Sequence, residues 1–338
     1  MRHPEQQVAV LERGLLPSGA STKNAGFACF GSISELKDDL ETMGERALVD
    51  LVLLRYEGLV RMRELLGDEK IDYRPVGGFE LLFETANRAD IDFYNDLLQP
   101  ALGKRPFREQ AMDAFPFGAK VKGVVANELE GSVHTGKMLR TLQARVAAAG
   151  VQLFTGADVL SVEERAQDVR LEVAYAGGQL QFTAQQVAVC NNAFARSFLP
   201  ELDLVPGRGA VLVTKPIPGL RLNGTFHYHS GYHYFRTVED RLLLGGGRQL
   251  DFQGEQTTSF GLNQLIINQL EEDLREFIVP HLSVEVDYAW SGIMAFGSDP
   301  LPYVSRVSPR MVAGVRLSGM GVAIASKVGQ EVAALLTS

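Results

Sequence analysis

The spacing of the apolar positions changes several times along this chain, and each change predicts a different element. A continuous apolar run over residues 8–11 ends in Glu12 and is followed by turn-forming glycine, proline and serine residues. Such a run is typical of a strand that is buried on both faces of a parallel sheet. Helical spacing follows over residues 34–66, 89–98 and 133–150.

From residue 151 the pattern changes to short strands that are separated by tight turns. These strands predict a meander and then a return to the parallel sheet, over residues 151–154, 159–163, 169–175, 180–183 and 186–190. A second strand-rich block covers residues 210–214, 224–229, 232–236, 241–245 and 284–290, with a helix over 260–277. A strand at 311–315 and an apolar helix at 322–336 close the chain, so the predicted fold class is α/β.

Length and charge narrow the class of protein. At about 150 residues per domain, the 338 residues predict two domains. The net charge is −8, from 33 basic and 41 acidic residues, and there is no basic run, which argues against a nucleic-acid partner. Cys29 and Cys190 are the two cysteines; they exclude a disulfide framework and predict a reducing, cytoplasmic location. No apolar run reaches the roughly 18 residues of a membrane span, and residues 1–7 lack the apolar core of a signal peptide.

Glu12 has the place of a ribose-binding acid. In a dinucleotide-binding fold the second strand ends in such an acid, and a Gly-x-Gly-x-x-Gly turn lies about 20 residues before it. Only 11 residues precede Glu12, whereas a strand, that turn and a helix need about 30. The segments 245–250 and 319–324 lack the required glycines. We therefore expect an N-terminally incomplete unit; the alternative is an ordinary buried strand whose acid faces solvent.

Several segments, taken in order, resemble a known family. Residues 10–14 and 19–27 resemble the second strand and following loop of FAD-dependent oxidoreductases of the D-amino-acid oxidase, glycine oxidase and sarcosine oxidase type. Residues 134–150, 187–193, 290–302 and 318–322 resemble later segments of the same enzymes, so the resemblance covers nearly the whole chain. The departures are the absent glycine turn and Met294, where many relatives have arginine.

The resemblance implies an architecture and an activity. An FAD-binding, Rossmann-like domain would comprise residues 1–45, 131–205 and 291–338, and a substrate domain with a mostly antiparallel sheet would comprise 46–130 and 206–290. FAD would be bound non-covalently, with both cysteines buried, and would accept a hydride from the C–N bond of a small carboxylated amine or amino acid. The electron acceptor stays open. The cofactor-binding positions would be Glu12, Arg13, Ser21, Thr22, Lys23, Asn24, Ala25, Gly26, Val159, Asn192, Ala193, Gly292, Met294, Gly319, Met320, Gly321 and Val322.

For two of these segments there is also a physical reason to expect cofactor binding. The turn at residues 319–321 opens a helix, whose free N–H groups and positive dipole end favour an anion. The loop at residues 21–24 offers hydroxyl, amide and ammonium donors, and Lys23 would favour reduced, anionic flavin. The alternatives are a turn needed only for packing and a solvated loop in which Asn24 makes a local turn.

Tyr232, Tyr234 and Arg236 alternate along a predicted strand and share one face. A guanidinium flanked by phenols can hold a carboxylate, so we expect Arg236 to anchor the substrate, with Arg208 and Arg248 as weaker alternatives. The competing interpretation is an ordinary surface strand. His227, His229 and His233 lack carboxylate or cysteine ligands at suitable spacing, so we expect no metal site and favour a pocket-lining imidazole.

Two other functions remain open. A chain without the pyrophosphate turn could be a non-catalytic remnant that binds no FAD, because that turn makes the strongest phosphate contacts. A flavin-dependent 2-hydroxy-acid dehydrogenase would also need an arginine anchor.

Overall fold

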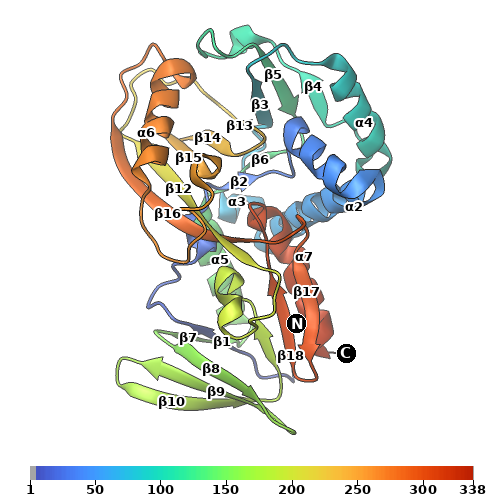
Figure 1. Ribbon diagram of the computed structural model, residues 1–338, viewed down its shortest axis with the longest axis vertical. Coiled ribbons are helices and arrows are strands. Elements are labelled where there is room, and N and C mark those ends of the chain that lie inside the picture. Colours follow the sequence, from blue (N-terminus) through green and yellow to red (C-terminus); the bar gives the residue numbers. More distant parts are fainter. Residues whose placement is uncertain (1–4, 338) are drawn as a thin grey trace.

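The computed structural model describes residues 5–337, and a large mixed sheet occupies the upper part of the molecule (Figure 1). Its strand order is β16-β12-β15-β14-β13-β3-β5-β4. All neighbours are antiparallel except β13 and β3, which are parallel. This confirms the expected mostly antiparallel sheet. The strands are β3 (Gly78–Leu82), β4 (Phe107–Glu109), β5 (Gly123–Asn127), β12 (Val205–Thr214), β13 (Thr225–Tyr228), β14 (His233–Val238), β15 (Arg241–Gly246) and β16 (Val286–Phe296).

The two faces of this sheet have different environments because side chains alternate along each strand. On one face, Phe226, Tyr228 and Phe235 are fully buried and pack with Leu270 and Phe277. The last two belong to α6 (Gln264–Asp273) and to the π-helical turn η4 (Leu274–Ile278) that continues it. The opposite face of β12 to β15 is left to line a cleft, described below.

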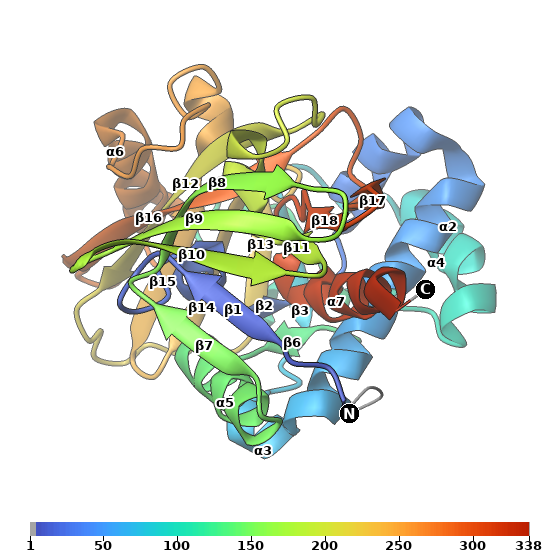
Figure 2. The same ribbon diagram turned by 90° about the horizontal axis from the view of Figure 1, so that it is seen from below.

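Smaller sheets form the lower part of Figure 1 and are turned toward the viewer in Figure 2, which shows the molecule from below. β1 (Ala9–Glu12) pairs in parallel with β7 (Gln152–Thr155), and β11 (Val187–Val189) pairs in parallel with β18 (Met311–Val315). β17 (Tyr303–Ser308) is antiparallel to β18. The predicted meander is confirmed as β8 (Asp158–Glu164), β9 (Val169–Tyr175) and β10 (Gly178–Ala184). Among residues 5–337, β1 and β11 each have a single hydrogen-bonded neighbour, so the two parallel pairs stay separate.

The long predicted helix is present as α2 (Ile33–Leu66), with a break at Gly44, where φ is +76°. It begins with a capping box between Ser32 and Glu35. The expected domain boundary at 45/46 lies beside this break, whereas the boundary at 290/291 falls inside β16. The other helices are α1 (Ala20–Lys23), α3 (Asp68–Ile71), α4 (Arg88–Leu102), α5 (Thr135–Ala148) and α7 (Gly321–Thr337). Short elements are β2 (Phe27–Ala28), β6 (Gly131–Ser132), η1 (Met112–Ala114), η2 (Asn192–Ser197) and η3 (Arg248–Asp251).

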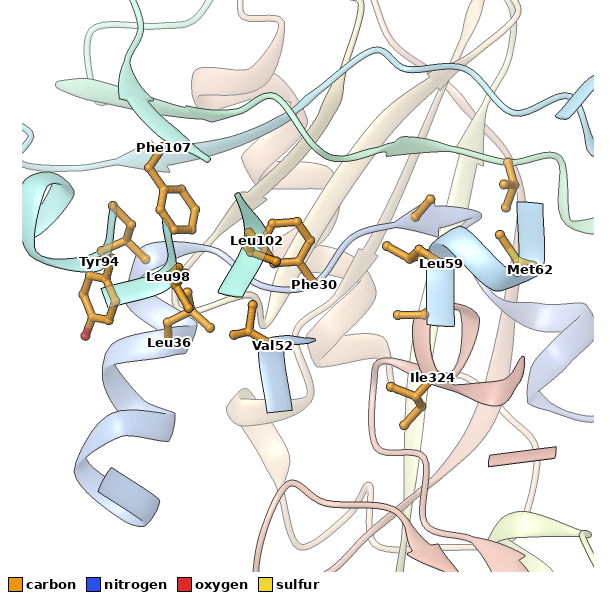
Figure 3. Close-up of a cluster of buried hydrophobic side chains, with 14 of the residues drawn as sticks. Phe30, Leu36, Val52, Leu59, Met62, Tyr94, Leu98, Leu102, Phe107 and Ile324 are labelled. Carbon is orange, nitrogen blue, oxygen red and sulfur yellow. The ribbon is translucent and has the colours of Figure 1, made fainter. Parts of the chain in front are cut away.

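A second core joins α2 to α4 and α7. Figure 3 shows Leu36 of α2 beside Leu98 of α4, and Ile324 of α7 on the side of Leu59 and Met62 of α2. At Gly58 the two helix backbones come so close that a Cβ atom would lie 2.0 Å from the carbonyl oxygen of Ala323. This contact fixes the N-terminal end of α7. No helix in the described part of the chain is both long and apolar enough to cross a membrane.

Candidate functional site

A cleft of about 3030 Å³ runs between the large sheet and the smaller sheets. It exceeds the roughly 300–1000 Å³ of ordinary small-molecule pockets, so it has room for a dinucleotide together with a substrate. The cleft is lined by all of the predicted cofactor-binding residues except Gly26. Of the three predicted substrate-binding residues, Tyr232 and Tyr234 line it and Arg236 does not. Their binding roles stay predictions.

Glu12 ends β1 at the wall of the cleft. Its Oε1 accepts a hydrogen bond from the backbone N–H of Gly14 at 2.9 Å, which fixes the carboxylate beside the strand end. The guanidinium of Arg13 lies over the ring of Phe194, 4.1 Å from its centre, and so joins this strand end to η2. The acid is therefore held at the edge of the cleft, as the ribose-binding interpretation requires.

The loop at residues 20–24 is partly occupied by its own hydrogen bonds. The side chain of Asn24 donates to Ser21 O (2.7 Å) and accepts from Gly26 N (2.9 Å) and Thr135 Oγ1 (3.0 Å), so it makes the local turn considered as an alternative above. Thr22 Oγ1 donates to Gly19 O. The Lys23 ammonium and the Ser21 hydroxyl have no partner among the described residues. These two groups are the ones free to bind a ligand.

The turn before α7 presents backbone donors to the cleft. Within the described residues, the N–H groups of Gly321 and Val322 have no acceptor, and α7 is 17 residues long. The positive end of its dipole therefore faces the cleft. Asn192 Oδ1 accepts from Arg316 N (3.0 Å) and Leu317 N (3.4 Å), which ties η2 to the segment that leads into this turn.

Four residues form a row across the cleft face of the large sheet. Glu80, His227, Tyr234 and Gly245 are successive cross-strand partners on β3, β13, β14 and β15. Gly245 lets the Tyr234 ring lie against it, because a Cβ atom there would be 2.6 Å from a ring carbon. Burial raises the pKa of Tyr234 to about 12 and lowers that of His227, so both are neutral at pH 7. His227 Nε2 is buried without a partner in the described chain.

The prediction that Arg236 anchors a substrate is not supported. Arg236 follows Tyr234 on the same face of β14, and Tyr232 lies in the turn before that strand. The guanidinium of Arg236 donates from Nε to Ala25 O and from Nη2 to Val133 O (3.2 Å). Burial lowers its pKa to about 10. Gly26 makes this contact possible: its φ is +75°, and a Cβ atom would lie 2.7 Å from Arg236 Nη2. Both residues therefore hold the loop after α1 against the start of α5.

Arg248, the weaker alternative, lies at the cleft instead. Its guanidinium stacks on the rings of Phe296 (4.0 Å to the centre) and Phe252 (4.8 Å). No hydrogen bond or ion pair engages it within the described residues, and burial lowers its pKa. Arg208, by contrast, is paired with the buried Glu255 at 2.8 Å. Arg248 is thus a cation at the cleft that no acid of residues 5–337 pairs with directly.

Sequence reasoning missed two buried acids that lie near each other, Glu80 of the row of four and Glu130. Glu130 Oε1 accepts from Phe30 N (2.8 Å) and Gly31 N (3.3 Å), and Glu80 accepts from the N–H and hydroxyl of Ser34. Burial raises the pKa of Glu130 to about 8 and that of Glu80 to about 7, helped in both cases by the nearby Glu35. The scattered positions of these acids in the sequence gave no signal of this group.

His227, His229 and His233 have different surroundings, and so do the two cysteines. His229 stacks on Phe83 and His233 lies on the α6 face of the sheet, while His227 faces the cleft. No group of three metal-ligating side chains occurs in residues 5–337. Cys29 is buried, 3.9 Å from the sulfur of Met320, but Cys190 is exposed, contrary to expectation.

The chain matches the FAD dependent oxidoreductase family over residues 2–335. A curated relative, the probable oxidoreductase OrdL of Rhizobium meliloti (strain 1021), is 27% identical over 213 residues, which are 61% of this chain and 47% of the relative. The match therefore spans about half the length of that relative.

Solved structures show the same fold. Glycine oxidase from Geobacillus kaustophilus superimposes with a TM-score of 0.77 at 19% identity, covering 98% of this chain and 88% of the oxidase. L-proline dehydrogenase from P. horikoshii gives a TM-score of 0.76 at 15% identity, covering 98% and 87%.

Proposed function

This chain belongs to the FAD-dependent oxidoreductase family, and we propose that it oxidises the C–N bond of an amino acid or of another amine that carries a carboxylate. The relatives act on such compounds: one is a glycine oxidase and another an L-proline dehydrogenase. The supporting observation in this chain is the unpaired guanidinium of Arg248 at the cleft.

The residues of the cleft fit FAD. Glu12 offers a carboxylate at the end of β1 for ribose hydroxyls, and the free N–H groups of Gly321 and Val322 suit the electron-rich edge of the flavin ring. Lys23 and Ser21 add free donors from the facing loop. FAD, when bound, supplies the hydride acceptor.

Arg248 would hold the substrate carboxylate. A guanidinium binds a carboxylate through two parallel hydrogen bonds, and the contacts with Phe252 and Phe296 restrict where the guanidinium can lie. Burial disfavours the charged form of Arg248, so an anion that binds here should gain more binding free energy than at an exposed arginine. Tyr232, whose ring contacts Phe252, adds a hydroxyl beside it.

Tyr234 and His227 would line the other end of the substrate. Both are neutral, so neither repels an ammonium group or an iminium product. The amine must lose its proton before its carbon can release a hydride, and solvent can accept that proton through the open cleft. The contribution of the chain is then mainly to position the substrate.

The test compares matched substrates on the purified chain supplied with FAD. Proline is paired with pyrrolidine, and N-methylglycine with dimethylamine, so that each pair differs by the carboxylate. We expect turnover, measured both as peroxide formation and as dye reduction, to favour the carboxylated member by about 100-fold in kcat/KM. Equal rates would refute the carboxylate requirement. Faster turnover of lactate than of alanine would favour a 2-hydroxy-acid dehydrogenase. A protein that keeps no flavin absorbance after the free FAD has been removed would favour the non-catalytic remnant.

A further inference from the structure

A chain of hydrogen bonds runs through the α6 face of the large sheet and ends at the turn that carries Arg248. Tyr228 donates its hydroxyl to Asp273 Oδ2 at 2.6 Å, and Nδ1 of His233 lies 3.2 Å from the same oxygen. On the other side of the ring, Nε2 of His233 lies 2.6 Å from the side-chain nitrogen of Gln249. Tyr228, His233 and Asp273 are almost fully buried. Buried networks of this kind favour one arrangement of their members.

The partners of His233 lie on both sides of its ring. The Asp273 carboxylate can only accept, so Nδ1 of His233 carries a proton. Nε2 forms the hydrogen bond to the side-chain amide of Gln249. His233 therefore links Gln249 to Asp273 and determines how the Gln249 side chain is held.

The turn itself is pressed against this imidazole. Gly246 and Gly247 both have positive φ (+109° and +79°), and Gly247 N donates to Tyr232 O at 2.9 Å. A Cβ atom at Gly246 would lie 1.8 Å from that same oxygen. After these glycines the chain sends Arg248 toward the cleft and Gln249 toward His233. Two side-chain hydrogen bonds hold this turn, one between Gln249 and His233 and one from Asn263 to Asp251 Oδ2 (2.8 Å), and the first lies next to Arg248.

We propose that His233, oriented by Asp273 and Tyr228, is a positioning residue: through Gln249 it holds the η3 turn so that the Arg248 guanidinium is preorganised for a carboxylate. This inference rests on the anchor role of Arg248 proposed above. Arg248 has aromatic contacts but no hydrogen bond of its own within the described chain, so the direction of its side chain depends on the backbone that carries it. Binding gains affinity when such a group is held in place beforehand.

The test uses benzoate as a carboxylate probe and benzamide as its neutral match, titrated calorimetrically into the chain supplied with FAD. Gln249→Met removes the hydrogen bond but leaves the buried imidazole paired with Asp273, and Gln253→Met, on the exposed side of the same segment, is the matched control. We expect Gln249→Met to bind benzoate about tenfold more weakly and benzamide as before, with the control unchanged. His233→Gln, which keeps an acceptor for Gln249, should lose less affinity than His233→Leu.

A double-mutant cycle separates this proposal from the anchor role. In the Arg248→Met background, Gln249→Met should cause no further loss of benzoate affinity, because the group being positioned is gone. Equal losses for benzoate and benzamide, or full benzoate affinity in a folded Gln249→Met protein, would overturn the positioning role. Should Arg248→Met itself bind benzoate normally, the proposed anchor fails, and the positioning proposal fails with it.

Discussion

The guanidinium of Arg248 lies 4.0 Å above the centre of the Phe296 ring, at the wall of the cleft. Phe296 is itself seated against Gly207 of the neighbouring strand, where a Cβ atom would be 2.5 Å from a ring carbon. The cation is therefore held between aromatic rings and forms no ion pair within the described residues. This combination distinguishes it from Arg208 and Arg236, which are engaged by Glu255 and by backbone carbonyls.

Replacing Arg248 by methionine should weaken the binding of carboxylated substrates. Methionine keeps the contact with Phe296 but removes both hydrogen bonds to the carboxylate, so we expect KM for the carboxylated substrate to rise about 100-fold with a small change in kcat. Arg248→Lys should recover part of the loss, since lysine keeps the charge but not the fork. Steady-state kinetics with both members of a substrate pair measures this. Arg221→Met, on an exposed loop, is the control, and an equal rise in KM for the decarboxylated member would contradict the anchor role.

Replacing Arg236 should affect stability instead. Its guanidinium satisfies the carbonyl oxygens of Ala25 and Val133, which Arg236→Met would leave unpaired. We expect the free energy of unfolding to fall by about 1–3 kcal/mol, measured by urea denaturation. Any rise in KM should then be the same for the carboxylated and decarboxylated substrates. A selective rise for the carboxylated one, without loss of stability, would restore Arg236 as the anchor.

The local patterns of the sequence were sufficient for most elements. α2, α5, the meander β8 to β10 and α7 all follow from apolar spacing over neighbouring residues, and the sequence correctly places Tyr234 and Arg236 on one strand face. That spacing does not reveal how far along the strand the cleft extends. Arg236 lies two residues beyond Tyr234, where the loop at Ala25 covers it, and this covering depends on packing between distant segments.

The place of Arg248, which the sequence offered only as a weaker alternative, and the burial of the two acids depend on similar long-range packing. Arg248 faces the cleft because β14 and β15 are in the register that pairs His233 with Gly246. Glu130 and Glu80 are acids that composition alone would place at the surface. They are buried because Ser34, Phe30 and Gly31, which lie far away in the sequence, donate hydrogen bonds to them.

The buried Glu130 should make stability depend on pH. Its pKa is about 8 in the folded protein, against an ordinary value of 4.5, so between these values the folded state holds a proton that the unfolded chain releases. The free energy of unfolding should therefore fall as pH rises toward 8, by a few kcal/mol in all. In Glu130→Gln the free energy of unfolding should fall less as the pH rises, because the titrating group is gone. The variant should therefore be more stable than the wild type at pH 9, but not at pH 5.5.

Urea denaturation at pH 5.5, 7 and 9 measures this difference. Glutamine can still accept from Phe30 N and Gly31 N through its carbonyl oxygen, so the substitution removes the charge and keeps the hydrogen bonds. Glu201→Gln, at an exposed carboxylate, is the matched control and should follow the wild type at each pH. Parallel curves for Glu130→Gln and the wild type would show that Glu130 is ionised in the folded state.

The close approach of α2 and α7 at Gly58 should tolerate no side chain. A Cβ atom there would lie 2.0 Å from Ala323 O, and Gly58 O also accepts from Ser326 Oγ at 2.7 Å, so the helices cannot separate without losing that bond. We expect Gly58→Ala to lower the free energy of unfolding by about 1–3 kcal/mol. Gly329→Ala, on α7 with open space around it, should instead raise it by about 0.5–1 kcal/mol through helix propensity. Because the crossing fixes the end of α7 that faces the cleft, Gly58→Ala should also weaken FAD binding, measured by flavin fluorescence. Unchanged stability in Gly58→Ala would mean that the two helices do not cross at this residue.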